Sequence, residues 1–262
     1  MTSAAASYVS RRIVGAPVRE DPFPHIYVED VFPAEIYSAL RAAWPPLEEM
    51  RPLVSTGRVR RAEGFEDGDL TRPYQNRYVL RLEDEDMERL PDPCRPFWDD
   101  LSAWLLGRDF TVALLQKFGP YFPPREPGPE PGLPVLTEAM LTRDLTGYGL
   151  GPHSDHEQRL LSLMFYCPPD DSTALHGTSL YVPRDPAASY PGGGHYDFSE
   201  FRRVATMPFR PNSAFAFVKR RDSFHGVEPV TEPDVARDLI LYIMRTSLRM
   251  AGNTKQGIGN SE

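Results

Sequence analysis

The sequence predicts an α+β fold, in which a core of short antiparallel strands has helices packed on one face. Apolar residues recur at helical spacing before residue 120, whereas short apolar or alternating runs follow one another after residue 135. Many of the 28 prolines stand at junctions between these segments, where they interrupt neither a helix nor a central strand. We therefore expect a single domain over residues 1–262, mainly helical over 1–120, with its strand core over 135–248.

Three segments before residue 120 have the apolar spacing of a helix that faces a core. The first begins at Phe32-Pro33 and ends at Pro45-Pro46, because proline is tolerated at the start of a helix but not inside it. The apolar positions of the three helices are Ile36, Leu40 and Trp44; Phe97, Trp98, Leu101, Trp104 and Leu105; and Leu114, Leu115 and Phe118.

Six short runs after residue 135 are expected to be strands, since each is bounded by Gly, Pro, Asp or Asn. Many short strands joined by turns are typical of an antiparallel sandwich or barrel. Two long loops rich in proline and glycine, 122–134 and 182–198, are candidate lids. The six expected strands are 135–141, 159–167, 178–183, 203–209, 212–219 and 237–245.

Composition argues against several classes of protein. The 29 basic and 37 acidic residues give a net charge of −8, so no general basic excess is available to bind nucleic-acid phosphates. Two distant cysteines, Cys94 and Cys167, provide neither a disulfide framework nor a thiolate zinc cluster. No run reaches the roughly 18 apolar residues of a membrane span, and Arg11-Arg12 lacks the apolar segment of an export signal. We expect a cytoplasmic protein.

The motif PHSD at 152–155 places a histidine and a carboxylate two positions apart. Alternate residues of a strand point to the same side, so His153 and Asp155 could bind adjacent positions on one metal ion. The motif alone is weak, because an ordinary polar turn before a buried strand would look the same. A third ligand must come from another strand, and the candidates are His25, His156, His176, His195 and His225.

His225 is the best placed of these histidines, since it follows a strand and precedes Gly226, which would let the backbone pass close to a site. His156 is expected to face away from the metal. His176 and His195 lie in loops, where they could contact the substrate, although solvation is the first expectation. Arg237 then begins the last strand, where a guanidinium entering an apolar run usually needs a carboxylate partner.

In this order, PHSD (152–155), FHGVEPV (224–230) and ARDLILYI (236–243) resemble the His-x-Asp…His…Arg signature of the Fe(II)- and 2-oxoglutarate-dependent dioxygenases. Within this superfamily the chain is similar to the prolyl-4-hydroxylase-like oxygenases of bacteria. Residues 21–45 also resemble their lead-in, a short strand and a helix before the catalytic barrel. The resemblance covers 12–45 and 137–248, and it implies a double-stranded β-helix (jelly-roll) core.

The resemblance implies that His153, Asp155 and His225 bind Fe(II), and that Arg237 binds the distal carboxylate of the cosubstrate 2-oxoglutarate. Tyr148 matches a frequent tyrosine of the family and would hydrogen-bond the cosubstrate. The gap between His225 and Arg237 is longer than usual, which leaves Arg245 as an alternative anchor. The implied enzyme consumes O₂, releases succinate and CO₂, and takes ascorbate as a candidate reductant.

The presence of Asp155 favours hydroxylation, or another oxidation such as desaturation or ring formation, over chlorination, because related halogenases lack this carboxylate. A small-molecule substrate, such as an amino acid or a carrier-bound or natural-product intermediate, is the first expectation. A protein or peptide side chain is the second, and a non-catalytic binding barrel the third. Arg143 and the basic turn Lys219-Arg220-Arg221 could meet an anionic substrate, although a surface salt bridge and a solvated turn explain them equally well. The oligomeric state stays open.

Overall fold

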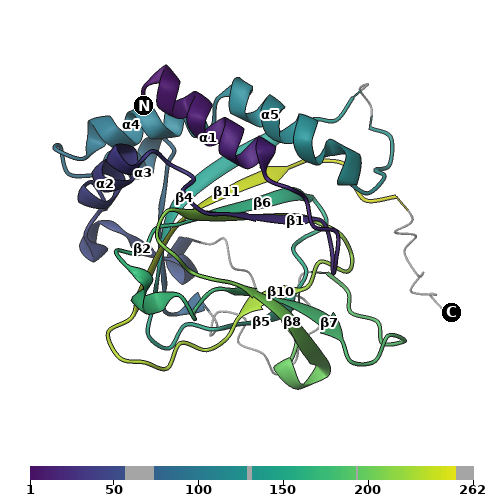
Figure 1. The fold of residues 1–262 in the computed structure, drawn as a ribbon. Helices are drawn as coiled ribbons and strands as arrows, with labels where there is room; N and C mark the ends of the chain where they lie inside the picture. The colour runs from purple at the N-terminus through teal and green to yellow at the C-terminus, as the bar shows by residue number, and fades with distance from the viewer. Residues whose placement is uncertain (57–73, 129–131, 193, 252–262) are drawn as a thin grey trace, which may run out of the picture.

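Two antiparallel sheets form the centre of the molecule (Figure 1), which the computed structural model describes at residues 1–56, 74–128, 132–192 and 194–251. The larger sheet has the order β1-β9-β6-β11-β4-β3-β2, and the smaller sheet β5-β10-β7-β8. The strands are β1 (His25–Val28), β2 (Arg51–Pro52), β3 (Arg77–Arg81), β4 (Leu136–Leu145), β5 (Leu150–His153), β6 (Arg159–Tyr166), β7 (Thr178–Pro183), β8 (Phe201–Met207), β9 (Ser213–Val218), β10 (His225–Val227) and β11 (Ala236–Arg245).

The helices cover the face of the larger sheet that points away from the smaller one, as Figure 1 shows for α1, α4 and α5. The α-helices are α1 (Ser3–Gly15), α2 (Ala34–Ala42), α3 (Asp84–Met87), α4 (Arg95–Leu105) and α5 (Arg108–Phe118). Single 3-10 turns lie at Leu47–Glu49, Leu53–Thr56, Gly119–Tyr121, Asp171–Thr173 and Phe198–Glu200. The three helices expected from the apolar spacing are thus confirmed.

The main core lies between these helices and the larger sheet. Trp98 of α4 is fully buried, and its indole nitrogen donates a 2.7 Å hydrogen bond to the carbonyl of Ala43. Because side chains of a strand alternate between its faces, β11 sends Ile240 and Tyr242 to this core and Leu239 to the other side. A second cluster, which includes Leu239, Tyr166 and Leu180, joins the two sheets.

All six strands expected after residue 135 are confirmed, with bounds that differ by at most a few residues. The helical pattern of the first part hid β3, whose sequence RYVLR begins and ends on arginines. Both arginines have acidic partners in the folded chain, Asp144 for Arg77 and Asp86 for Arg81. Arg81 and Asp86 are close in the chain, but Arg77 and Asp144 are 67 residues apart. The segment is a strand because it pairs with β4, a distant part of the chain.

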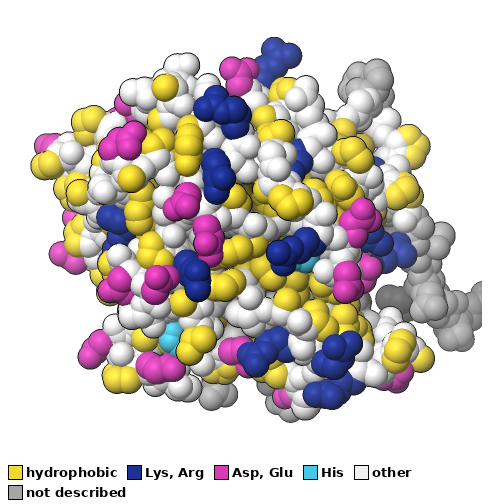
Figure 2. Space-filling model, in the orientation of Figure 1, with side chains coloured by type: hydrophobic (Ala, Val, Ile, Leu, Met, Phe, Trp, Pro, Cys, Tyr) yellow, Lys and Arg dark blue, Asp and Glu magenta, His cyan; other side chains and the backbone are white. Residues whose placement is uncertain are grey.

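Among the described helices, none combines the length and the hydropathy needed to cross a bilayer. Lysine and arginine are interspersed with aspartate and glutamate on the face drawn in Figure 2. The candidate lids are partly described, since residues 129–131 and Gly193 lie outside the described residues.

Candidate metal centre and anion pocket

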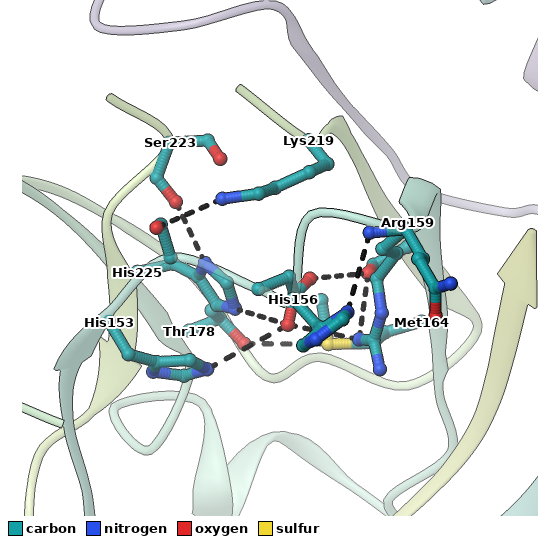
Figure 3. Close-up of polar contacts among 12 residues, drawn as sticks. His153, His156, Arg159, Met164, Thr178, Lys219, Ser223 and His225 are labelled. Atoms are coloured by element: carbon teal, nitrogen blue, oxygen red, sulfur yellow. Dashed lines mark hydrogen bonds and ion pairs between the residues drawn. The ribbon is translucent and has the colours of Figure 1, made fainter. Parts of the chain in front are cut away.

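His153 and His225 lie directly opposite each other on neighbouring strands. His153 ends β5 and His225 begins β10, and the two are register partners of this antiparallel pair. Their ring centroids are 4.3 Å apart, and Figure 3 shows the two imidazoles side by side. Asp155 Oδ1 lies 3.9 Å from the Nε2 atom of each histidine. One donor atom from each of the three residues lies within 4.8 Å of the others, an arrangement that could hold a metal ion.

Backbone carbonyls orient both histidines. Nδ1 of His153 lies 3.0 Å from the carbonyl of Gly151, and Nδ1 of His225 lies 3.0 Å from that of Ser223. Because a carbonyl only accepts, each Nδ1 carries the proton and donates it, which leaves the Nε2 lone pair for a metal. Burial, assisted by the neighbouring His225, lowers the pKa of His153 to about 3. Burial also lowers the pKa of His225, so both rings are neutral near pH 7.

The carboxylate of Asp155 is held on both oxygens. Ser162 Oγ donates a 2.8 Å hydrogen bond to Oδ2, and Arg159 donates a 3.0 Å hydrogen bond to Oδ1. Arg159 also donates to Ser162 Oγ at 3.1 Å, so the three groups brace one another. Burial by itself would raise the pKa of Asp155, but the charge of Arg159 and the other neighbours outweigh burial and hold it well below its usual range. The carboxylate is therefore ionised and oriented before any metal binds.

The triad lines a cavity of about 220 Å³ between the two sheets. Arg237, Arg77, Tyr148 and Thr142 line one part of this cavity, which we call the anion pocket. Five aliphatic side chains line another part, which we call the aliphatic wall: Leu53, Val79, Met140, Leu241 and Ile243.

Two buried hydroxyl groups in the anion pocket have no hydrogen-bond partner among the described residues. They are Tyr148 Oη and Thr142 Oγ1, and both residues are completely buried. An unpaired buried hydroxyl costs free energy, so such a pair indicates a place for a polar ligand. Burial raises the pKa of Tyr148, which keeps its hydroxyl protonated and able to donate.

Arg237 is only 1% exposed and enters the anion pocket at the start of β11. Its Nε donates to the carbonyl of His176 and its Nη1 to Asp144 Oδ2, both at 2.6 Å. The carboxylate partner expected for this arginine is therefore Asp144. Arg245, the alternative anchor, lies outside the cavity, has a half-exposed side chain and pairs with Glu138 at 3.1 Å.

The structure places the remaining candidate residues in different surroundings. His25 is buried in β1, and its Nδ1 donates to the carbonyl of Phe23 at 2.8 Å, away from the triad. His156 is exposed and does not join the described metal group, as expected. Arg143 does not line the cavity; it makes two hydrogen bonds, of 2.6 and 3.0 Å, to the buried carboxylate of Asp238.

Two expectations of solvated residues are wrong. His195 stacks on His153 with centroids 4.6 Å apart, and its Nε2 lies 2.8 Å from the hydroxyl of Tyr74. Lys219 is 1% exposed and donates to Ser154 Oγ at 2.9 Å, beside the triad as Figure 3 shows. Burial lowers the pKa of Lys219 to about 8. Sequence reasoning missed both because each contact joins residues that are far apart in the chain, His195 with Tyr74 and Lys219 with Ser154.

Several site residues carried no signal of their own in the sequence. Arg77, Thr142 and Ser162 are single polar residues within strands, and only the period-2 alternation places Thr142 and Ser162 on the cavity side. Arg159 is the first residue of an expected strand, and its partner Asp155 lies four residues earlier, so the strand pattern did not predict the pair.

No protein-family model matches the chain, and no curated protein matches it. Among solved structures, it is similar to a 2OG-Fe(II) oxygenase family oxidoreductase from Burkholderia pseudomallei, with 12% identity over 92% of this chain and 89% of that one, at a TM-score of 0.46. A Trichoplax adhaerens prolyl hydroxylase, solved with a peptide fragment of hypoxia inducible factor, has 12% identity over 92% and 90%, at 0.48. HygX from Streptomyces hygroscopicus, solved with nickel, 2-oxoglutarate and hygromycin B, has 11% identity over 94% and 88%, at 0.48.

All three likenesses are distant, at 11% to 12% identity. The similar solved structures include 2-oxoglutarate- and Fe(II)-dependent oxygenases, and the chain carries a His-Asp-His triad that could bind iron.

Proposed function

We propose that the chain is an Fe(II)- and 2-oxoglutarate-dependent oxygenase that hydroxylates a C–H bond of a small molecule. One observation carries the proposal: a buried His153-Asp155-His225 triad shares a single cavity with a buried arginine, Arg237, and two unpaired hydroxyl groups. Two neutral imidazoles and one carboxylate on the same face are the ligand set of non-haem Fe(II) oxygenases.

The residues of the triad fit a divalent metal without rearrangement of their protonation states. Both Nε2 atoms are unprotonated, and Asp155 is ionised and held by Ser162 and Arg159. When bound there, Fe(II) with 2-oxoglutarate would supply the oxidation of the substrate by O₂. The protein's part is to hold the reactants in place and to exclude water from the cavity.

The anion pocket fits the distal carboxylate of the cosubstrate. Arg237 offers N–H donors, and the hydroxyl groups of Tyr148 and Thr142 can donate to the same anion. Binding of a carboxylate would thus pair two buried oxygens that have no hydrogen-bond partner in the described part of the chain. Ascorbate, if it acts, would act as a reductant of the metal.

The aliphatic wall supports a small substrate whose reacting part is hydrocarbon-like. Along β11 the cavity-facing residues run from Arg237 to Ile243, a span of about 20 Å at the rise of a strand. Ile243 is the register partner of Ser162, which holds Asp155, so the aliphatic wall adjoins the metal ligands. Apolar side chains would hold a C–H bond there in a dry environment.

We further propose that the two sheets form a double-stranded β-helix and that residues 1–262 form one oxygenase domain. The support is that the sheets join through a shared apolar cluster, with His153 and His225 on the smaller sheet and lining the cavity between the sheets. Tyr190 packs on Phe201 at 4.7 Å and Tyr196 on Phe224 at 6.5 Å, which fits loop 182–198 as a cover beside the triad.

The test is anaerobic addition of Fe(II) and then 2-oxoglutarate, read as the weak visible charge-transfer band of their complex. We expect the band in the wild type and in Arg245→Ala, no band in Asp155→Ala, and a much higher 2-oxoglutarate requirement in Arg237→Ala with iron binding retained. A matching loss in Arg245→Ala instead would overturn the assignment of the anchor. Absence of the band in the wild type would favour a non-catalytic binding barrel.

The substrate class is tested by succinate formation with a panel of apolar small molecules and a panel of peptides. We expect the apolar compounds to stimulate succinate release. Stimulation by peptides alone would favour the protein side-chain hydroxylase.

A further inference from the structure

Three charged side chains form a row across three neighbouring strands on the cavity side of the larger sheet. Asp144 of β4 is the register partner of Arg77 on β3 and of Arg237 on β11. Arg77 donates to both carboxylate oxygens of Asp144, from Nε at 2.6 Å and from Nη2 at 2.8 Å. Arg237 donates to Oδ2 at 2.6 Å. Asp144 is completely buried, so its charge has to be compensated within the protein.

The charge balance of this row decides whether the anion pocket can hold an anion. Asp144 neutralises one of the two guanidinium groups, and the row keeps a formal charge of +1. Without Arg77, the charges of Arg237 and Asp144 would cancel and the pocket would be neutral. The carboxylate of a ligand would then be buried there without a net opposite charge. Arg77 therefore provides the positive charge that an incoming carboxylate needs.

The remaining hydrogen-bonding capacity agrees with this balance. No described residue accepts a hydrogen bond from Nη1 of Arg77 or from Nη2 of Arg237. The ring of Tyr148 contacts both guanidinium groups, whose Cζ atoms lie 4.5 Å (Arg77) and 5.8 Å (Arg237) from its centroid. Its unpaired hydroxyl thus belongs to the same group of donors.

We propose that Arg77 is a second arginine of the cosubstrate site, which supplies the net positive charge while Asp144 positions Arg237. This inference rests on the proposed function. Asp144 is then a positioning residue, and the pocket is specific for a ligand that brings one carboxylate to this end, as 2-oxoglutarate does.

The opposite face of the sheet provides a matched control. Asp238 accepts two hydrogen bonds from Arg143, at 2.6 and 3.0 Å, and one from Arg41 at 2.8 Å. This trio repeats the pairing of Asp144, but Arg143, Asp238 and Arg41 do not line the cavity. A variant of Arg143 therefore removes an equivalent salt bridge without touching the anion pocket.

The experiment titrates 2-oxoglutarate calorimetrically into protein loaded with Zn(II), which has no redox chemistry and allows no turnover. The proteins are the wild type, Arg77→Met, Asp144→Asn, the double variant Arg77→Met/Asp144→Asn, and Arg143→Met as control. Their formal pocket charges are +1, 0, +2, +1 and +1, by the count given above.

We expect Arg77→Met to weaken 2-oxoglutarate binding about 10- to 100-fold, the effect of losing a charged partner of a buried group. The double variant should regain most of this affinity, and Arg143→Met should bind like the wild type. Removing both partners also relieves the defect left by a merely structural salt bridge, so urea unfolding of each variant is measured as well. Charge balance predicts that 2-oxoglutarate affinity follows the formal pocket charge, whereas a structural role predicts that it follows the free energy of unfolding. If Arg77→Met does not fold, Asp144→Asn is compared with the double variant, because these two proteins differ only in the guanidinium of Arg77. Asp144→Asn should then bind 2-oxoglutarate more tightly than the double variant.

Unchanged affinity in Arg77→Met, or a double variant no better than Arg77→Met, would overturn this inference and leave the proposed function standing. A wild type that binds Zn(II) but no 2-oxoglutarate would overturn both.

Discussion

Replacing Ser162 by alanine is expected to weaken metal binding about 10- to 100-fold, the usual effect of losing a group that orients a metal ligand. Ser162 is 2% exposed, and its hydroxyl is the described donor to Asp155 Oδ2, at 2.8 Å. The variant leaves Oδ2 buried without this partner, while Arg159 still holds Oδ1. A lost hydrogen bond to a buried charge costs about 1.5–3 kcal/mol, which matches a tenfold to hundredfold change in affinity.

The assay is anaerobic titration with Co(II) in competition with a chromogenic chelator, together with urea unfolding of the metal-free protein. Ser213→Ala is the control. Ser213, at the start of β9, is also buried, but its hydroxyl donates to the carbonyl of Arg210 at 2.8 Å and not to the triad. We expect the control to lose stability with unchanged metal affinity. If Ser162→Ala binds Co(II) as tightly as the wild type while Asp155→Ala does not bind it, the serine does not orient the ligand and the reasoning is refuted.

Two further predictions concern the backbone around the triad and the pH dependence of stability. Gly226→Ala should weaken metal binding by more than its loss of unfolding free energy alone would suggest, because its Cβ would lie 2.4 Å from the carbonyl oxygen of Leu150 and push β10 away from β5. The control is Gly119→Ala, whose Cβ would have open space around it, and it should change neither metal affinity nor stability in the same titrations. Burial lowers the pKa of His25, so below about pH 6.5 the unfolded chain takes up a proton at this residue that the folded chain does not. As the pH is lowered, this residue therefore reduces the free energy of unfolding by at most about 1.4 kcal/mol per pH unit. The free energy of unfolding of metal-free His25→Asn, measured with urea, should therefore fall less steeply between pH 7 and pH 5 than that of the wild type. Equal slopes for the two proteins would contradict the lowered pKa of His25.

Local sequence determined the strands of the core and the spacing of the metal ligands. The alternation of small and aromatic residues in β9 and the apolar run of β6 are properties of a few adjacent residues, and the structure confirms both strands. The two-residue spacing of His153 and Asp155 likewise needs only an extended backbone. Among five candidate histidines the sequence favoured His225, and in the structure His225 pairs with His153 across two strands.

Tertiary structure alone decided the charge environment of the site. Asp144 is 67 residues from Arg77 and 93 residues from Arg237, so the row exists only because β3, β4 and β11 pair in one register. A shift of one residue would turn Asp144 to the helical face and remove it from both arginines. Electrostatic interactions of this kind depend on distance and burial, which the order of residues along the chain does not specify. The sequence by itself therefore determined the candidate metal ligands and the strands beside them, whereas the fold decided which charges surround them.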